Sequence, residues 1–191
     1  PYYDAATKGV DFAGMLAALN AAPAGTIVVL HACCHNPTGY DITAQQWSQV
    51  VQTVKSRSLV AFLDMAYQGF GDGIAEDGAV IGKFVDSGLD FFVSTSFSKS
   101  FSLYGERVGA LSVACESKDE AERVLSQLKR VIRTNYSNPP THGATVVATL
   151  GGLTATGVAN GASLANAATA ASVPDTIVRR DSSGNFAAAA I

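Results

Sequence analysis

The first 150 residues alternate between short apolar runs and segments with helical spacing of apolar residues. The run at 26–31 (TIVVLH) is β-branched, and three more apolar runs follow at 59–63, 91–95 and 108–114. Runs of five to seven apolar residues bounded by turn-forming residues are typical of buried β-strands. The pattern therefore predicts four strands, the second of which ends at Asp64 and the third at Ser96.

Two of the intervening segments carry the signature of an amphipathic helix. Thr43 with Gln46, and Ser117 with Glu120, have the spacing of a capping box, in which the two residues satisfy each other's backbone N–H groups. After each box the apolar residues recur at intervals of three and four, which predicts one buried helix face. These faces consist of Trp47, Val50, Val51 and Val54 in the first helix and Val124, Leu125, Leu128, Val131 and Ile132 in the second.

Buried strands that alternate with helices predict an α/β fold with a mainly parallel sheet and helices on both faces. Periodicity does not determine the direction of each strand, so one strand could run antiparallel.

The composition changes at about Gly151. From there to Ile191 the chain consists mostly of Gly, Ala, Ser, Thr and Asn, and neither the helical nor the strand period persists. Such a segment buries too little apolar surface to offset the entropy lost on ordering. We therefore expect two regions, a folded domain at 1–150 and a low-complexity tail at 151–191 that is flexible or repeat-like.

Charge and cysteine content narrow the choice of function. The net charge is −3, and no block of Lys or Arg is present, which argues against a nucleic-acid-binding protein or a polybasic membrane anchor. No apolar run approaches the length of a membrane-spanning helix. The three cysteines form no disulfide framework, which favours the reducing cytoplasm.

Polar side chains gather where the predicted strands end, which is where ligands bind in open α/β sheets. They comprise an amide, a carboxylate, a phenol, two hydroxyls, an amine and a guanidinium, from Asn36, Asp64, Tyr67, Ser96, Ser98, Lys99 and Arg107. A cofactor with a phosphate, a ring nitrogen and an aldehyde would use all of these groups. Simpler roles remain open for some of them, such as turn capping by Asp64 and turn initiation by Asn36.

A metal site is not expected. His31, Cys33, Cys34 and His35 resemble a ligand cluster, but adjacent cysteines point to opposite sides of an extended chain and no second ligand pair follows.

Four motifs in order resemble the class I pyridoxal-phosphate aminotransferases of the aspartate and aromatic-amino-acid (tyrosine) branch. They are HACCHNPTGYD (31–41), FLDMAYQGF (62–70), STSFSKSFSLYGERVGALSV (94–113) and IRTNYSNPPTHGA (132–144). The resemblance implies the large domain of the fold-type I pyridoxal-phosphate enzymes, here incomplete. It also implies amino-group transfer between an aromatic or acidic L-amino acid and a 2-oxo acid.

The resemblance implies a role for each residue of the cluster. Lys99 binds the aldehyde of pyridoxal 5'-phosphate covalently and then moves the substrate proton. Asp64 pairs with the pyridine nitrogen, while Asn36 and Tyr67 bind the ring's 3-oxygen, and Tyr67 is counted with Lys99 as catalytic. Ser96, Ser98 and Arg107 hold the cofactor, with Ser96 and Arg107 at its phosphate.

The resemblance further implies that Arg133 reaches into the active site of a partner subunit, where it binds the distal carboxylate of the substrate. A homodimer is therefore expected.

The sequence also departs from the resemblance. Complete enzymes of this branch are much longer, and the arginine for the substrate α-carboxylate and the aromatic that stacks on the cofactor ring have no counterpart here. We therefore expect a fragment with little or no turnover. The segment 174–191 resembles repeats of bacteriophage tail-fibre-like proteins, so a non-catalytic fusion or surface module with a vestigial aminotransferase core is the alternative. A lyase or synthase on the same fold is a third possibility.

Overall fold

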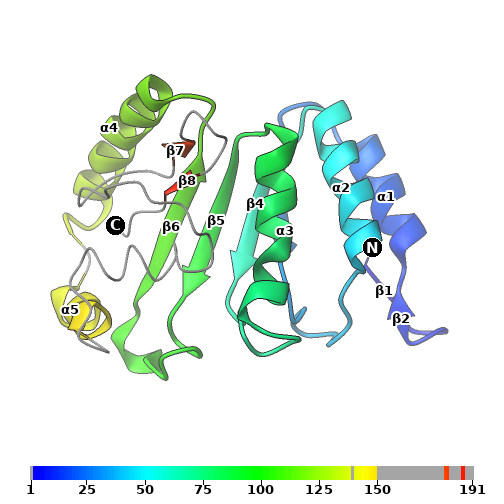
Figure 1. Ribbon diagram of the computed structural model, residues 1–191, viewed down its shortest axis with the longest axis horizontal. Coiled ribbons are helices and arrows are strands. Elements are labelled where there is room, and N and C mark those ends of the chain that lie inside the picture. Colours follow the sequence, from blue (N-terminus) through cyan, green and yellow to red (C-terminus); the bar gives the residue numbers. More distant parts are fainter. Residues whose placement is uncertain (1, 139, 150–178, 181–185, 188–191) are drawn as a thin grey trace.

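The computed structural model describes residues 2–138, 140–149, 179–180 and 186–187 (Figure 1). Its helices and strands, in chain order, are β1 (Tyr3–Asp4), β2 (Gly9–Val10), α1 (Phe12–Ala21), β3 (Ile27–His31), α2 (Ala44–Ser56), β4 (Val60–Met65), α3 (Ile74–Ser87), β5 (Phe91–Ser96), the 3-10 turn η1 (Tyr104–Glu106), β6 (Gly109–Ala114), α4 (Lys118–Asn135), α5 (Thr141–Thr149), β7 (Arg179–Arg180) and β8 (Phe186–Ala187).

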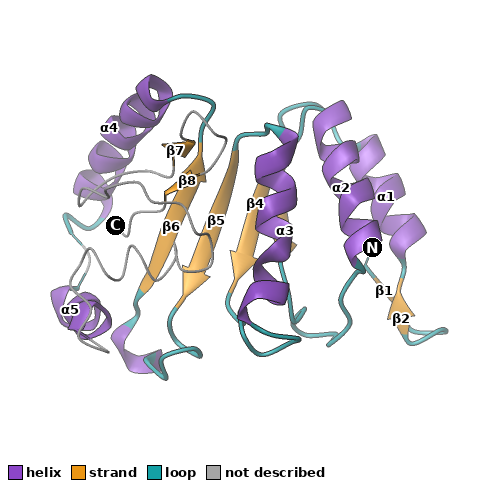
Figure 2. Cartoon of the chain, viewed as in Figure 1, coloured by secondary structure: helices purple, strands orange, loops and turns teal. Residues whose placement is uncertain are grey.

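The central sheet has the strand order β3-β4-β5-β6. The pairs β3–β4 and β4–β5 are parallel, whereas β6 pairs with β5 antiparallel. The arrows of β4 and β5 in Figure 2 accordingly point to one edge of the sheet and that of β6 to the other. The predicted α/β class with a mainly parallel sheet is confirmed. The sequence left open whether one strand runs antiparallel, and that strand is β6.

Helices cover both faces of this sheet. On one face α1, α2 and α3 lie side by side, and their apolar residues form the main core with alternate strand residues such as Phe91 and Val93 (Figure 1). On the other face α4 packs through Val124, Leu125 and Leu128 against Phe92 and Val113. This second face is only partly covered, because Ile27 and Val29 of β3 are more than 60% exposed.

The predicted capping box is confirmed in full for α2 and in part for α4. Thr43 and Gln46 form the full capping box, with backbone-to-side-chain distances of 2.7 and 3.2 Å. Ser117 caps α4 through the N–H of Glu120, but the Glu120 carboxylate binds the N–H of Glu116, so the predicted reciprocal half of this box is wrong.

The buried face predicted for the second helix is also wrong at one residue. Val131 is 52% exposed, because α4 packs on β5 and β6 through Val124, Leu125 and Leu128, and Val131 lies outside this cluster.

The strand boundaries differ from the predicted ones by one or two residues. The largest difference is at β4, which continues to Met65, so Asp64 lies within the strand and not after it. In this position Asp64 pairs with His31 on one side and with Ser94 on the other.

The Thr43 cap should stabilise the N-terminus of α2. Thr43→Ala removes the acceptor for the Gln46 N–H and should lower the free energy of unfolding by about 1 kcal/mol. Urea denaturation measures this change, and Thr43→Ser, which keeps the hydroxyl, serves as the control. Equal stability of the alanine variant and the parent protein would show that the cap contributes nothing.

Most of the predicted tail lies outside the described residues. Within it, β7 and β8 form a short antiparallel pair. No helix among the described residues is long and apolar enough to cross a membrane.

Candidate active site

A row of polar side chains crosses the sheet near the carboxyl ends of β3, β4 and β5. His31, Asp64 and Ser94 are register neighbours, and paired residues in a sheet share a face. The Ser94 hydroxyl lies 3.5 Å from Asp64 Oδ1. Further from this edge the same face is apolar, with the rings of Phe62 and Phe92 5.7 Å apart. The face opposite α1–α3 therefore changes from apolar to polar at the edge where the predicted site lies.

Lys99 lies in a single turn that begins directly after β5. The turn is closed by backbone hydrogen bonds from Phe101 to Phe97 and from Ser102 to Lys99. It places Lys99 Nζ 4.5 Å from the centre of the Tyr67 ring. Ser98 is buried within this turn, and its N–H donates to Ser96 Oγ at 3.2 Å, so the two predicted serines fix the turn that carries the lysine.

The segment between β3 and α2 presents Asn36 to the same point. Its backbone is held by Asp41, whose carboxylate accepts the N–H groups of Cys34 and His35 at 2.6 and 2.7 Å. The Asn36 side-chain amide then donates to Tyr67 Oη at 3.4 Å. Tyr67 thus contacts both Asn36 and Lys99 and joins the three residues in one group.

His31 and His35 contribute to the packing of the segment between β3 and α2. His31 Nδ1 accepts the N–H of Asn36 at 3.2 Å, and the His35 ring stacks on Tyr2 with the centroids 3.9 Å apart. Burial, reinforced by the neighbouring His31, lowers the pKa of His35. His35 is therefore neutral at pH 7 and acts as a packing group.

Arg107 is tied to the same rim through Tyr104. Its guanidinium donates to the Tyr104 carbonyl oxygen at 2.9 Å, and the Tyr104 ring centre is 5.9 Å from Lys99 Nζ. Arg107 itself has a left-handed backbone (φ 52°) and an exposed side chain. The exposed guanidinium keeps further N–H groups with which it can bind an anionic ligand.

The turn that carries Arg107 is buttressed by the start of α5. His142 Nδ1 lies 2.7 Å from Glu106 Oε2, and Gly143 packs directly on the Glu106 backbone. A Cβ added at Gly143 would be 2.8 Å from Glu106 Cβ and 3.1 Å from its carbonyl oxygen, closer than side chains approach in folded proteins.

We therefore expect Gly143→Ala to displace η1 and to destabilise the chain by about 1–3 kcal/mol, the usual cost of overpacking. Hydrogen exchange of the amides at 104–108 should accelerate, whereas exchange in α2 should stay the same. Gly82→Ala is a matched control, since a Cβ there meets no atom within 4 Å. Unchanged exchange at 104–108 would contradict the buttressing role of α5.

The structure thus places seven of the predicted residues on one rim and the eighth, Arg133, away from it. Asn36 and Lys99 each contact Tyr67, and Asp64, Ser96, Ser98 and Arg107 lie on the same rim. Arg133 lies in the last turn of α4, where its guanidinium donates to Ser137 Oγ and not to any rim residue among those described.

Three further residues at the rim were not singled out for the cofactor site from the sequence. Ser94 lies two residues before Ser96, so the two-residue period of a strand places the two serines on one face of the sheet. His31 is found only once the register of β3 and β4 is known. Tyr104 gives no local signal, because its position depends on the fold of the loop after Lys99.

The prediction that Cys33 and Cys34 point to opposite sides of an extended chain is wrong. Cys34 has φ 49°, so the chain is not extended there, and the thiols of Cys33 and Cys34 lie near each other and near Asp77. His31 and His35 do not belong to this group.

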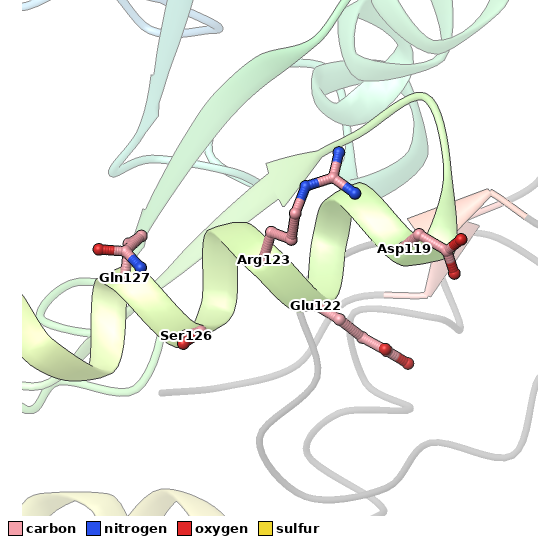
Figure 3. Close-up of a pocket in the computed structure, with 5 residues that line it drawn as sticks. All are labelled: Asp119, Glu122, Arg123, Ser126 and Gln127. Atoms are coloured by element: carbon pink, nitrogen blue, oxygen red, sulfur yellow. The ribbon is translucent and has the colours of Figure 1, made fainter.

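Among the described residues, those that line a shallow depression elsewhere all belong to α4 (Lys118–Asn135). Figure 3 shows Asp119, Glu122, Arg123, Ser126 and Gln127 along α4. None of the predicted site residues lines it, and its mixture of exposed charges is ordinary for a helix surface.

The fold and the site define an α/β protein with a lysine, a phenol and an amide at the carboxyl edge of a mainly parallel sheet. Residues 1–153 match the family described as "Aminotransferase class I and II", and the chain belongs to this family. The aspartate aminotransferase of Pseudomonas aeruginosa is 67% identical over 149 residues, which are 78% of this chain and 37% of the relative. The aromatic-amino-acid aminotransferase of Escherichia coli K12 is 57% identical over 148 residues, 78% of this chain and 37% of that protein.

Solved structures agree with this assignment. The aromatic-amino-acid aminotransferase of Burkholderia pseudomallei, covalently bound to pyridoxal phosphate, is 70% identical with a TM-score of 0.76. The match covers 78% of this chain and 37% of that one. The chain therefore spans a little over a third of the length of these relatives.

Proposed function

We propose that the domain at 1–150 is a pyridoxal-phosphate-binding core for amino-group transfer between an aromatic or acidic L-amino acid and a 2-oxo acid. The observation that carries this proposal is the contact group of Asn36, Tyr67 and Lys99 on the rim that also holds Asp64. The relatives named above are aspartate and aromatic-amino-acid aminotransferases.

The residues of the rim fit the groups of this cofactor. An amine for the aldehyde, a phenol and an amide for the ring hydroxyl, a carboxylate for the ring nitrogen and an exposed guanidinium for the phosphate are all present, from Lys99, Tyr67, Asn36, Asp64 and Arg107. When bound, pyridoxal phosphate supplies an aldehyde that captures the amino group and a ring that accepts the electron pair left at the substrate Cα.

Each residue then has a defined task. Lys99 Nζ would hold the cofactor through its aldehyde and would accept the proton from the substrate Cα. Asp64 would hold the proton on the ring nitrogen, and the Tyr67 hydroxyl, which accepts a hydrogen bond from Asn36, would bind the ring's 3-oxygen. Ser96 and Ser98 fix the lysine turn. All three of Ser96, Ser98 and Arg107 would contact the cofactor, with Ser96 and Arg107 at its phosphate.

The finer assignments extend the same proposal. Arg133 would bind the distal carboxylate of a substrate in the site of a second subunit, which requires a homodimer. We place the protein in the cytoplasm, and we propose that the tail at 151–191 is a separate, flexible or repeat-like region of tail-fibre type.

A graft tests the function of the core. Residues 1–149 of this chain replace the matching segment of the Pseudomonas aeruginosa aspartate aminotransferase, and transamination of 2-oxoglutarate is measured with aspartate and with tyrosine. We expect the graft to be active and the same graft with Lys99→Ala to be inactive. The isolated chain should be far slower, because substrate positioning accounts for up to roughly 7–11 kcal/mol of a barrier. A folded but inactive graft would favour the alternative, a vestigial core in a non-catalytic fusion.

A further inference from the structure

Two thiols and one carboxylate meet beside the rim, and the proposed function uses none of them. Cys33 and Cys34 follow β3, and Asp77 lies in the first turn of α3. Their ligand atoms all lie within 4.8 Å of one another. Cys33 and Asp77 are buried, with exposed fractions of 7% and 8%, and Cys34 is half-buried.

The backbone explains how adjacent cysteines come to share one site. In an extended strand the side chains of neighbouring residues point to opposite faces. Cys34 instead has φ 49°, and its N–H is held by Asp41 at 2.6 Å. This left-handed residue turns the second thiol toward the first.

Asp77 is fixed in place before any ligand arrives. Its carboxylate accepts the backbone N–H groups of Gly69, Gly71 and Asp72 at 2.8 to 3.0 Å. Burial alone would raise the pKa of Asp77, but these backbone donors outweigh it and hold that pKa below its usual value. No Lys, Arg or His in the described part of the chain forms an ion pair with Asp77. Within the described part of the chain, this buried carboxylate therefore stands beside two thiols and forms no ion pair.

We propose that Cys33, Cys34 and Asp77 form a binding site for a thiophilic divalent cation of the zinc and cadmium class. Two sulfurs and a carboxylate oxygen are preferred ligands of these ions, and three protein ligands leave the fourth tetrahedral position open. Ligand atoms at the corners of such a site are about 3.8 Å apart, so the three groups need to move inward by only about 1 Å.

The Asp77 carboxylate favours a cation at this site, whereas the protons on the two thiols oppose it and have to be displaced. Burial, together with Cys34 and Asp77, raises the pKa of Cys33 to about 12, and burial together with Asp77 raises that of Cys34. Both thiols are therefore protonated at pH 7, and a bound cation displaces both protons. The balanced step forms two metal–sulfur bonds and breaks two S–H bonds, with two protons released to solvent.

The site adjoins the lysine rim through one contact. Cys34 Sγ lies 3.8 Å from the carbonyl oxygen of Tyr67, the residue whose ring faces Lys99. Cation binding therefore restrains the segment from Tyr67 to Asp72 on both sides, through the Cys34 contact and through Asp77.

Cadmium titration of the full chain, reduced with a phosphine and without pyridoxal phosphate, tests the proposal. We expect one cadmium per chain, an ultraviolet thiolate-to-cadmium absorption band, and about two protons released per ion. Cys33→Ser, Cys34→Ser and Asp77→Asn should each weaken binding by about tenfold or more. Cys115→Ser is the matched control, because this third buried thiol packs under α4 and should leave binding unchanged.

The readout does not depend on activity, so the result is separate from that of the proposed function. Circular dichroism of each variant establishes that it is folded, and Cys34→Ser at a half-buried position is the variant least prone to unfold. Binding that survives in folded Cys34→Ser, or that is lost in Cys115→Ser, would overturn the proposal. So would the absence of the absorption band in the parent chain at millimolar cadmium.

Discussion

Replacement of Lys99 by alanine should abolish covalent retention of pyridoxal phosphate by this chain. Lys99 Nζ lies over the Tyr67 ring and is the amine at the rim where the amide and carboxylate groups converge. Without this amine the aldehyde has no nucleophile at the site, so only weak noncovalent binding remains. After gel filtration, cofactor absorbance should fall at least about tenfold relative to the parent chain.

Lys118→Ala is the matched control for this experiment. Lys118 lies on α4, pairs with Glu122 at 3.6 Å and has a side chain that is 62% exposed. Its removal should leave cofactor retention unchanged. Equal retention by the Lys99 and Lys118 variants would mean that the rim does not capture the cofactor through Lys99.

Phe84→Ala should cause the largest loss of stability among single substitutions in the main core. Phe84 is fully buried in α3, and its ring centre is 5.3 Å from that of Phe91 and 6.3 Å from that of Trp47. Truncation removes apolar burial and leaves a cavity, which together cost about 3–5 kcal/mol. Since natural domains are stable by only about 5–15 kcal/mol, this variant should be close to unfolding.

Urea denaturation measures the loss in the free energy of unfolding for Phe84→Ala. Phe70→Ala, which truncates the same type of side chain, is the control. Phe70 is 61% exposed, so its truncation should change the free energy of unfolding by no more than about 0.5 kcal/mol. Similar losses for the two variants would mean that α3 is not packed on the sheet as described.

The sequence predicted well the features that local rules determine. The α2 helix begins at its capping box and buries the four residues that its spacing indicated, because both signals lie within a dozen residues. The apolar strands were found for the same reason. Lys99 and Tyr67 were placed on one rim because parallel strands end at one edge of a sheet.

Features that depend on contacts between distant segments were not predictable. The antiparallel direction of β6 depends on how the loop after Lys99 returns to the sheet, and apolar periodicity is the same in both directions. The pairing of His31 with Asp64 follows from strand register, which no local pattern specifies. The left-handed Cys34, and with it the thiol pair, depends on a hydrogen bond to Asp41 seven residues away.

The predicted role of Arg133 depends on a second subunit. Its role was inferred from a resemblance, and that role requires a second subunit, whereas its described contact is with Ser137 in the same chain. The function of Arg133 therefore stays a prediction.

Borohydride trapping tests most directly whether this domain captures pyridoxal phosphate at Lys99. The purified chain is mixed with pyridoxal phosphate and treated with borohydride, which reduces the carbon–nitrogen double bond to a stable secondary amine. Peptide mass spectrometry then locates the adduct among the lysines of the chain: Lys8, Lys55, Lys83, Lys99, Lys118 and Lys129. We predict a single adduct at Lys99. Labelling distributed over the surface lysines, or no labelling at Lys99, would contradict the claim.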